Sequence, residues 1–193
     1  MAIAKTLLNK LGEQKVEHQV VNHKKVYTAF DAAATLKVKL GEVVKSLLVK
    51  VGRDFYLALV AADKNLDLKK LAKVLNVSQS KLSIPKEKVM SEKFKVKPGA
   101  ISAFGSIHKI PVVIDQSLSK LKEGIFSSGS FTESIKMKVR DYLNLENPVV
   151  GNFSAIRKIT KQKKSRTKNQ KPKSSQTRKK TKKQSVKSQI KKR

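Results

Sequence analysis

The sequence predicts an α/β (α+β) domain in which a mixed β-sheet is flanked by helices. Some segments repeat apolar residues at helical spacing, and others alternate them or run them together as strands do. Two β-rich runs, residues 43–51 and 55–62, are joined by Gly52-Arg53-Asp54, which is typical of an antiparallel hairpin. Helical and β-rich segments are interspersed, so a partly antiparallel sheet covered by helices fits better than a doubly wound parallel sheet.

The first helices are predicted from apolar spacing and capping residues. Residues 2–11 place their apolar side chains on one helical face, and residues 15–21 alternate loosely as a strand does. Thr28 and Asp31 resemble a capping box, with Asp in place of Glu, that opens a helix over residues 30–37.

The remaining elements follow the same signals. Asp67 suits the start of a helix that runs to Leu75, and Pro85 suits the start of another. The other expected elements are buried strands at 110–115, 125–128 and 135–139 and a closing helical turn at 141–145.

Charge divides the chain in two. The net charge is +30, and 18 of the 44 Lys and Arg residues lie between 157 and 193, where there is no Asp or Glu. We therefore expect one domain over residues 1–155 and a disordered Lys/Arg-rich tail over residues 156–193, because such a tail cannot bury enough apolar surface to order itself.

The charge predicts a polyanionic partner. When Lys or Arg neutralises the phosphates of a nucleic acid, condensed counterions are released, and this release favours binding. Acidic membrane surfaces attract the same residues by charge. The tail lacks the Leu, Phe and Trp that insert into lipid, so nucleic acid is favoured over a membrane. The basic run 178–183 also resembles a nuclear localisation cluster. The expected nucleic-acid contacts of the tail are Arg157, Lys158, Lys163, Lys164, Arg166, Arg178, Lys179, Lys180, Lys182 and Lys183.

Several classes of chemistry are disfavoured. The absence of Cys excludes disulfides, cysteine metal sites and a cysteine nucleophile. The three His residues are too scattered for a metal motif, and neither a phosphate-binding P-loop nor a Gly-x-Ser-x-Gly elbow occurs. Residues 1–12 do not resemble a secretory signal and no apolar run has membrane-spanning length, so we expect a soluble, cytoplasmic protein.

Lys45 is the single cation in the apolar run 43–49. On a strand it shares a face with Leu47 and Val49, which favour burial, so its ammonium is expected in a partly dry cavity beside an oxygen-rich partner. The alternative is a lysine whose stem packs while its charged head reaches water, and the pattern alone favours this alternative.

Two loops are further candidates. Residues 98–105 contain Pro98, Gly99 and Gly105, and main-chain N–H groups in such a loop can bind a carbonyl or phosphate oxygen. Residues 127–130 read as a polar pocket wall or as a turn between strands. Most short loops of both kinds only connect elements.

Five segments, in this order, resemble the YbaK/ProX family, which includes the editing domain of bacterial prolyl-tRNA synthetases. The resemblance covers about residues 2–153. The segments that carry it are Val43-Val-Lys-Ser-Leu-Leu-Val49, Asp67-Leu-Lys-Lys-Leu-Ala72, Pro98-Gly-Ala-Ile-Ser-Ala-Phe-Gly105, Pro111-Val-Val-Ile-Asp115 and Ile125-Phe-Ser-Ser-Gly129.

The resemblance implies a barrel-like mixed sheet and hydrolysis of the ester that joins a wrong amino acid to tRNA, such as Ala or Cys on tRNA for proline. It implies no metal and no cofactor. Lys45 matches the essential lysine of the family, and Gly99 matches the start of its Gly-x-x-x-Pro loop, where this chain has Ala103 in place of Pro. The implied substrate-binding residues are Ser46, Ile101, Ser102, Ala103, Ser128 and Gly129.

The implied partner is the aminoacylated 3′ end of tRNA, whose unpaired bases can stack on aromatic side chains such as Phe104, Phe126 or Tyr27. Ribosomal RNA or DNA, bound through the tail, and an aminoacyl-tRNA synthetase are further candidate partners. Two other functions stay open: a non-catalytic RNA-binding protein that retains the family fold, and a DNA-compacting protein that acts through its tail.

Overall fold

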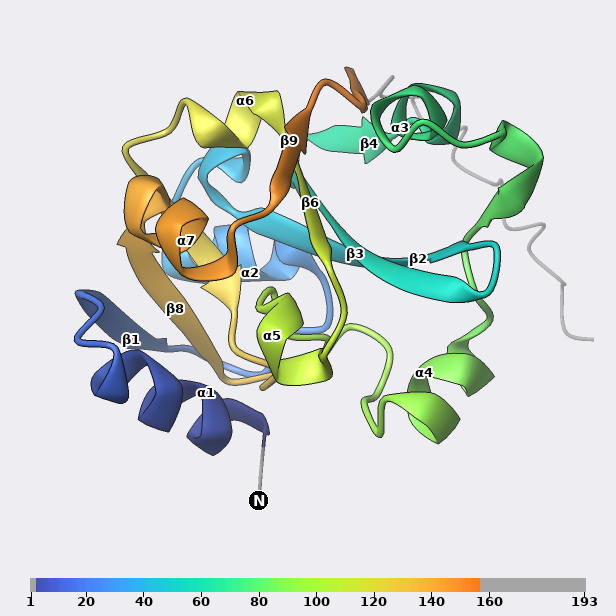
Figure 1. Cartoon of the computed structure of the whole chain (residues 1–193). Coiled ribbons are helices and arrows are strands. Elements are labelled where there is room, and N and C mark those ends of the chain that lie inside the picture. The colour runs from blue at the N-terminus through green and yellow to red at the C-terminus, as the bar shows by residue number, and fades with distance from the viewer. Residues whose placement is uncertain (1–2, 157–193) are drawn as a thin grey trace, which may run out of the picture. The chain divides into compact units, whose positions relative to one another are not determined.

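A five-stranded mixed sheet runs through the structure, a computed structural model that describes residues 3–156 (Figure 1). The predicted tail lies outside the described residues, apart from Ile156. Neighbours β5–β2 and β2–β3 are antiparallel, whereas β3–β6 and β6–β9 are parallel. In spatial order the strands are β5 (Leu82–Ser83), β2 (Val44–Val51), β3 (Asp54–Ala61), β6 (Val112–Asp115) and β9 (Val149–Gly151).

The predicted hairpin is confirmed. Strands β2 and β3 pair from Val44 with Ala61 to Val51 with Asp54, and a two-residue turn joins them. Gly52 in that turn has a φ of 62°, a conformation that glycine adopts without steric cost.

The expected barrel-like closure is wrong for the described residues. The other strands form two separate antiparallel sheets. One isolated bridge joins Val43, the residue before β2, to Ile125 of β7. Strand β2 pairs with β5 only at Lys50 and Val51, so its ladder on that edge is interrupted. One sheet is β1 (His18–Asn22), β8 (Glu133–Lys138) and β7 (Glu123–Ser127), and the other is β10 (Ser154–Ile156) with β4 (Lys64–Leu66).

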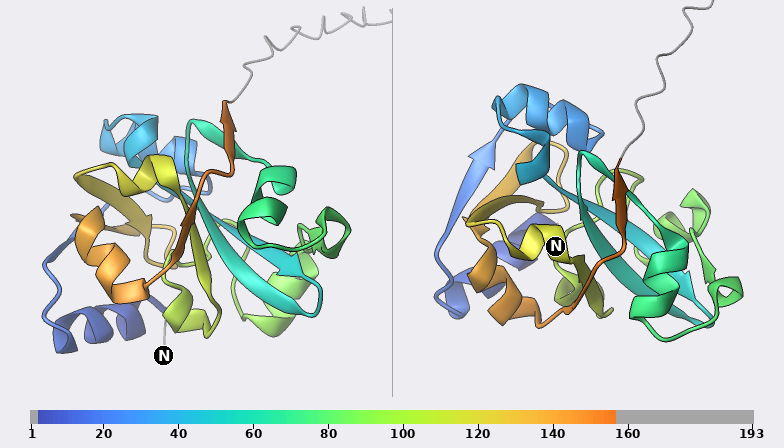
Figure 2. Two further views of the ribbon diagram at one scale, coloured as in Figure 1. Left: turned by 45° about the horizontal axis from the view of Figure 1, so that its top comes forward. Right: turned by 90° about the horizontal axis from the view of Figure 1, so that it is seen from above.

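Helices cover both ends of this arrangement. Figure 2 shows α1 and α7 on the side of the three-stranded sheet and α3 beside the β2–β3 hairpin. The helices are α1 (Ile3–Glu13), α2 (Ala29–Leu36), α3 (Leu68–Val74), α4 (Glu87–Lys93), α5 (Gly105–His108), α6 (Gln116–Ser119) and α7 (Val139–Glu146), with 3-10 turns η1 (Leu40–Glu42) and η2 (Gln79–Lys81).

The capping predictions are confirmed. The Thr28 side chain accepts a hydrogen bond from Asp31 N at 3.2 Å, and Thr28 N donates to the Asp31 carboxylate at 3.1 Å. Asp67 caps α3 by accepting from two main-chain N–H groups at 3.0 and 3.1 Å. The predicted strand at 15–21 begins later, at His18, because Lys15 adopts a left-handed φ of 51° at the end of α1.

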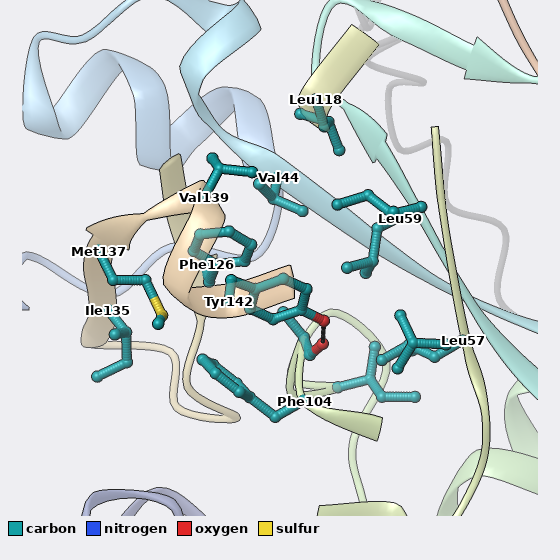
Figure 3. Packing of buried hydrophobic residues seen from close by; sticks show 14 of the residues in the cluster. Val44, Leu57, Leu59, Phe104, Leu118, Phe126, Ile135, Met137, Val139 and Tyr142 are labelled. Atoms are coloured by element: carbon teal, nitrogen blue, oxygen red, sulfur yellow. Dashed lines mark hydrogen bonds between the residues drawn. The ribbon is translucent and has the colours of Figure 1, made fainter. Parts of the chain in front are cut away.

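Three aromatic rings form the centre of the larger core (Figure 3). Tyr142 stacks on Phe126 with ring centroids 4.4 Å apart and meets Phe104 edge-on at 5.3 Å. The Tyr142 hydroxyl donates to the Ala103 carbonyl at 2.6 Å. Burial raises the pKa of Tyr142 well above its usual value, so this hydroxyl keeps its proton and remains a donor.

Asp115 is a buried carboxylate that holds the C-terminal strand in place. Its side chain is 1% exposed and accepts from the main-chain N–H groups of Ser117, Phe153 and Ser154 at 3.0, 2.9 and 2.8 Å. Burial alone raises the pKa of this carboxyl, but the hydrogen bonds from Ser117, Phe153 and Ser154 outweigh it, and the pKa lies below its ordinary value.

We predict that Asp115→Asn lowers the free energy of unfolding by about 1–3 kcal/mol at pH 7, because an amide cannot accept all of these hydrogen bonds. A lowered native pKa contributes stability above the unfolded pKa of about 3.9, and this contribution is lost as the pH falls through the native value. The difference between wild type and variant should therefore shrink below about pH 4 in urea titrations.

The control is Asp54→Asn, which changes an exposed carboxylate at the start of β3. The free energy of unfolding of this variant should lie within about 0.5 kcal/mol of the wild-type value. Equal unfolding free energies for Asp115→Asn and Asp54→Asn at pH 7 would contradict the assigned role.

Candidate functional site

A pocket of about 480 Å³ opens beside the interrupted edge of β2. Four stretches of chain contribute most of its lining: residues 26–30, which lead into α2; residues 43–48 of β2 and its approach; residues 84–90; and residues 98–101. This volume is in the range of small-molecule sites. Main-chain groups on an unpaired strand edge can bind a ligand as they would bind a neighbouring strand.

Lys45 lines this pocket and is half-buried. Its Nζ donates to the main-chain carbonyl of Lys64 at 2.7 Å, where β4 begins. The side chains that were expected to share its face, Leu47 and Val49, pack in the second core cluster around Phe153. The Lys45 side chain therefore lines the pocket, while its ammonium is bonded to the carbonyl of Lys64, a residue outside the pocket lining, and it does not lie at an exposed strand end.

Gly99 reaches the same pocket through a backbone conformation that requires glycine. Its φ is 84°, and a Cβ at this position would lie 2.5 Å from the Tyr27 carbonyl oxygen and 3.5 Å from a ring carbon of Phe131. A Cβ at 2.5 Å from a main-chain oxygen is a steric clash, so no other residue fits without moving the loop.

Ala103 anchors the other end of this loop. Its N–H donates to the Ser127 carbonyl at 2.9 Å, and its carbonyl accepts from the Tyr142 hydroxyl at 2.6 Å. A proline has no N–H and could not make the first of these bonds. The loop is thus fixed by hydrogen bonds at the position where the YbaK/ProX pattern has proline.

The structure brings together half of the residues expected at the site. Ser46 and Ile101 line the pocket with Lys45 and Gly99.

The other four expected residues are not part of the pocket lining. Ser102 and Ala103 are fully buried, and the Ser128 hydroxyl donates to the Glu133 carbonyl at 2.8 Å. Gly129 forms a turn with a φ of 96°. Residues 127–130 combine both alternatives that the sequence left open, because they turn the chain at Gly129 and place Ser127 and Ser130 in the pocket lining.

Ser46 is the most unusual of these side chains. Its Oγ is buried and has no hydrogen-bond partner among the described residues. A buried hydroxyl without a partner is costly in an empty site and becomes favourable when a ligand supplies a donor or an acceptor.

Other pocket residues were missed by the sequence analysis. His23 and Ser134 line the pocket and are joined by a hydrogen bond of 2.9 Å between Nε2 and Oγ. The sequence carries no signal for the pairing of His23 with Ser134, because it depends on β1 and β8, which are far apart in the sequence.

Residues 3–156 contain neither a membrane-spanning helix nor a cluster of metal-ligating side chains. No helix there is long and apolar enough to cross a membrane. Within the same residues, no group of three His, Asp or Glu side chains is placed to hold a metal ion.

Sequence comparison gives one family and two kinds of relative. Residues 23–145 match the family described as the aminoacyl-tRNA editing domain. The multifunctional Ser/Thr-tRNA deacylase ProXp-y of Escherichia coli is 29% identical over 152 residues, which span 76% of this chain and 90% of that protein. The prolyl-tRNA editing protein ProX of Acetoanaerobium sticklandii is 28% identical over 124 residues, 61% of this chain and 74% of that protein.

Solved structures share the fold. A protein described as a proposed trans-editing enzyme for prolyl-tRNA synthetase superposes with a TM-score of 0.70 at 21% identity, covering 80% of this chain and 98% of its own. The uncharacterised protein APE2540 superposes with a TM-score of 0.69 at 19% identity, covering 77% and 99%.

We predict that Gly99→Ala destabilises the protein more than Gly52→Ala does. Both glycines have positive φ, but a Cβ at Gly52 meets nothing within 4 Å, whereas one at Gly99 meets Tyr27. Gly52→Ala should cost about 1–2 kcal/mol from backbone conformation alone. Gly99→Ala should cost about 1–3 kcal/mol more, because the loop must move. Urea unfolding of both variants measures the difference, and equal losses would rule out the close approach.

Proposed function

This chain belongs to the aminoacyl-tRNA editing domain family, and from this premise we propose that it is a deacylase that hydrolyses mischarged tRNA in trans. The observation that carries the proposal is that Lys45 and Gly99, which come from separate parts of the sequence, line one pocket. The names of the E. coli and A. sticklandii relatives support the same general activity.

The proposed mechanism relies on positioning and charge stabilisation. An aminoacyl ester is already activated, so orienting a water and stabilising the developing oxyanion supply much of the rate. Lys45 would hold ribose or phosphate oxygens of the terminal nucleotide. The main-chain N–H groups of the Gly99 loop would orient the ester carbonyl, with Ile101 beside it. A hydroxyl of the substrate itself would activate the water, so no protein general base is invoked.

The proposed substrates carry small amino acids. Ala or Cys on tRNA for proline is the first candidate pair. Ser and Thr are further candidates, because the E. coli relative is a Ser/Thr-tRNA deacylase and the buried Ser46 Oγ in this pocket has no hydrogen-bond partner within residues 3–156. A hydrogen bond to a substrate hydroxyl discriminates far better than one methylene, which is worth only about 1–3 kcal/mol.

Partners beyond the tRNA are proposals of the same kind. The basic residues after 156 would add sequence-independent attraction to tRNA, and they could serve ribosomal RNA or DNA in the same way. An aminoacyl-tRNA synthetase that releases the mischarged tRNA is a further proposed partner, with the cytoplasm as the place of action.

The alternative function is an RNA-binding protein that keeps the fold without turnover. Ala103, in place of the proline of the family pattern, motivates it. The two hydrogen bonds of Ala103 argue for the enzyme, because they hold the loop in place without proline.

We predict that Lys45→Ala lowers kcat/KM by about 100-fold or more on the preferred substrate, since it removes a charge aimed at the reacting end of the tRNA. The assay is deacylation of tRNAs charged with Ala, Cys, Ser and Thr. Lys50→Ala is the matched control, because Lys50 is an exposed lysine of the same strand.

The control should keep nearly full activity, and thermal unfolding should show that both variants are folded. Retained activity in folded Lys45→Ala would reject the role of Lys45. A complete lack of turnover by the wild type on the whole panel, together with tight RNA binding, would favour the non-catalytic alternative.

A further inference from the structure

We infer that Tyr27 and Phe131 form a stacking platform for an unpaired base at the 3′ end of the RNA, beside the mouth of the pocket. The inference rests on the proposed function for the identity of the RNA. The inference is argued from the exposure of Tyr27, from its contact with Phe131 and from the lysines beside it.

Among the aromatic residues described in the pocket lining, Tyr27 is exposed and Phe30 is half-buried. Tyr27 is 56% exposed and lines the pocket, whereas Phe104 and Phe126 are fully buried and cannot reach a base. Ile84, which is 54% exposed, lines the same pocket. Large apolar side chains exposed together at a pocket rim indicate a surface that a ligand covers.

Two neighbouring segments hold Tyr27 in place. Its ring lies 5.1 Å from the half-buried Phe131 ring, centroid to centroid, at an angle of 54°. The preceding residue, Val26, donates its N–H to the Phe131 carbonyl at 2.9 Å, and the following residue, Thr28, caps α2. An aromatic side chain that is fixed before binding loses little conformational entropy when a base stacks on it.

The platform is next to the catalytic loop. The Tyr27 carbonyl oxygen is the atom that a Cβ on Gly99 would meet at 2.5 Å, and the Phe131 ring is also in reach of that Cβ at 3.5 Å. A ribose that presents its ester to the Gly99 loop therefore carries its base toward these rings. The 3′ end of tRNA is single-stranded, so its bases are free to stack.

Charge at the platform suits a nucleotide. The Lys25 Nζ lies 5.3 Å from the centroid of the Tyr27 ring, and Lys24 and Lys25 are both exposed. The carboxylate of Asp31, the nearest acid to Tyr27 in the sequence, is engaged by the main-chain N–H of Thr28. Two other acids are close: Glu133 follows Phe131 by two residues in β8, and Glu87 lines the pocket. Aromatic rings with adjacent cations are the combination by which single-stranded nucleic acid is bound without base-pair readout.

The sequence offers a direct probe, because the chain contains no Trp. Tyr27→Trp places one indole on the platform, and stacking of a base on it should quench its fluorescence. The ligand is a short RNA that ends in CCA, compared with the same RNA whose last two nucleotides are abasic. Both carry the same phosphates, so attraction by the basic tail is equal for the two.

We expect strong, saturable quenching by the CCA end and little by the abasic end. Tyr56→Trp is the control, because Tyr56 is half-buried and lines a different pocket at the other end of the hairpin; its quenching should not distinguish the two RNAs. Equal quenching of Tyr27→Trp by both RNAs would overturn the platform.

Binding by variants without Trp tests the same contact without a reporter. Tyr27→Ala should bind the CCA-ended RNA about 10-fold more weakly, and Tyr27→Phe should bind it as wild type does, because the ring and not the hydroxyl makes the contact. Neither change should affect the abasic RNA. Unchanged affinity of Tyr27→Ala for the CCA end would reject the inference, as would quenching of Tyr27→Trp by an apolar peptide but not by RNA.

These outcomes separate the platform from the proposed activity. Binding and quenching need no hydrolysis and can be repeated in the Lys45→Ala background. If binding depends on the terminal bases but no tRNA is deacylated, the proposed function is rejected and the platform is retained. If tRNA is deacylated but neither binding nor activity depends on Tyr27 or on the terminal bases, only the platform is rejected.

Discussion

The main chain of Ala103 is the constraint on which the site depends. Its N–H and carbonyl are both bonded, one to Ser127 at the end of β7 and the other to the core hydroxyl of Tyr142. These bonds tie the loop to the three-stranded sheet and to the aromatic core together. With that end fixed, Gly99 can approach the Tyr27 carbonyl more closely than any other residue would allow. Alanine in place of proline thus gives up a fixed dihedral but gains one hydrogen bond, from its N–H to the Ser127 carbonyl.

The pocket exists because β2 lacks a continuous neighbour on one edge. Pairing with β5 covers its last two residues, and the bridge at Val43 covers its approach, so the stretch that carries Lys45 and Ser46 is open among the described residues. A closed barrel would pair this edge throughout and would leave no main-chain groups for a ligand. The missing closure, which the sequence did not predict, and the pocket are therefore the same feature.

Local patterns made part of this architecture predictable. The β2–β3 hairpin and the caps at Thr28 and Asp67 depend on residues close together in sequence, and the family resemblance identified Lys45 and Gly99. The three-residue strands β4, β9 and β10 were not predicted, because their pairing depends on partners far along the chain. Tyr27 was one of three aromatic candidates; Phe126 falls in a run predicted as a buried strand, but the exposure of Tyr27 and the burial of Phe104 became clear only from the structure.

Residues beyond the matched family segment contribute to holding Lys45. That match ends at residue 145, whereas β10 comes later and is positioned by the buried carboxylate of Asp115 through Phe153 and Ser154. Strand β10 pairs with β4, and the first residue of β4, Lys64, supplies the carbonyl that accepts the Lys45 ammonium. A half-buried ammonium needs an oxygen partner, because its desolvation would otherwise be uncompensated. The chain after residue 145 is therefore part of what keeps the proposed catalytic cation at the pocket.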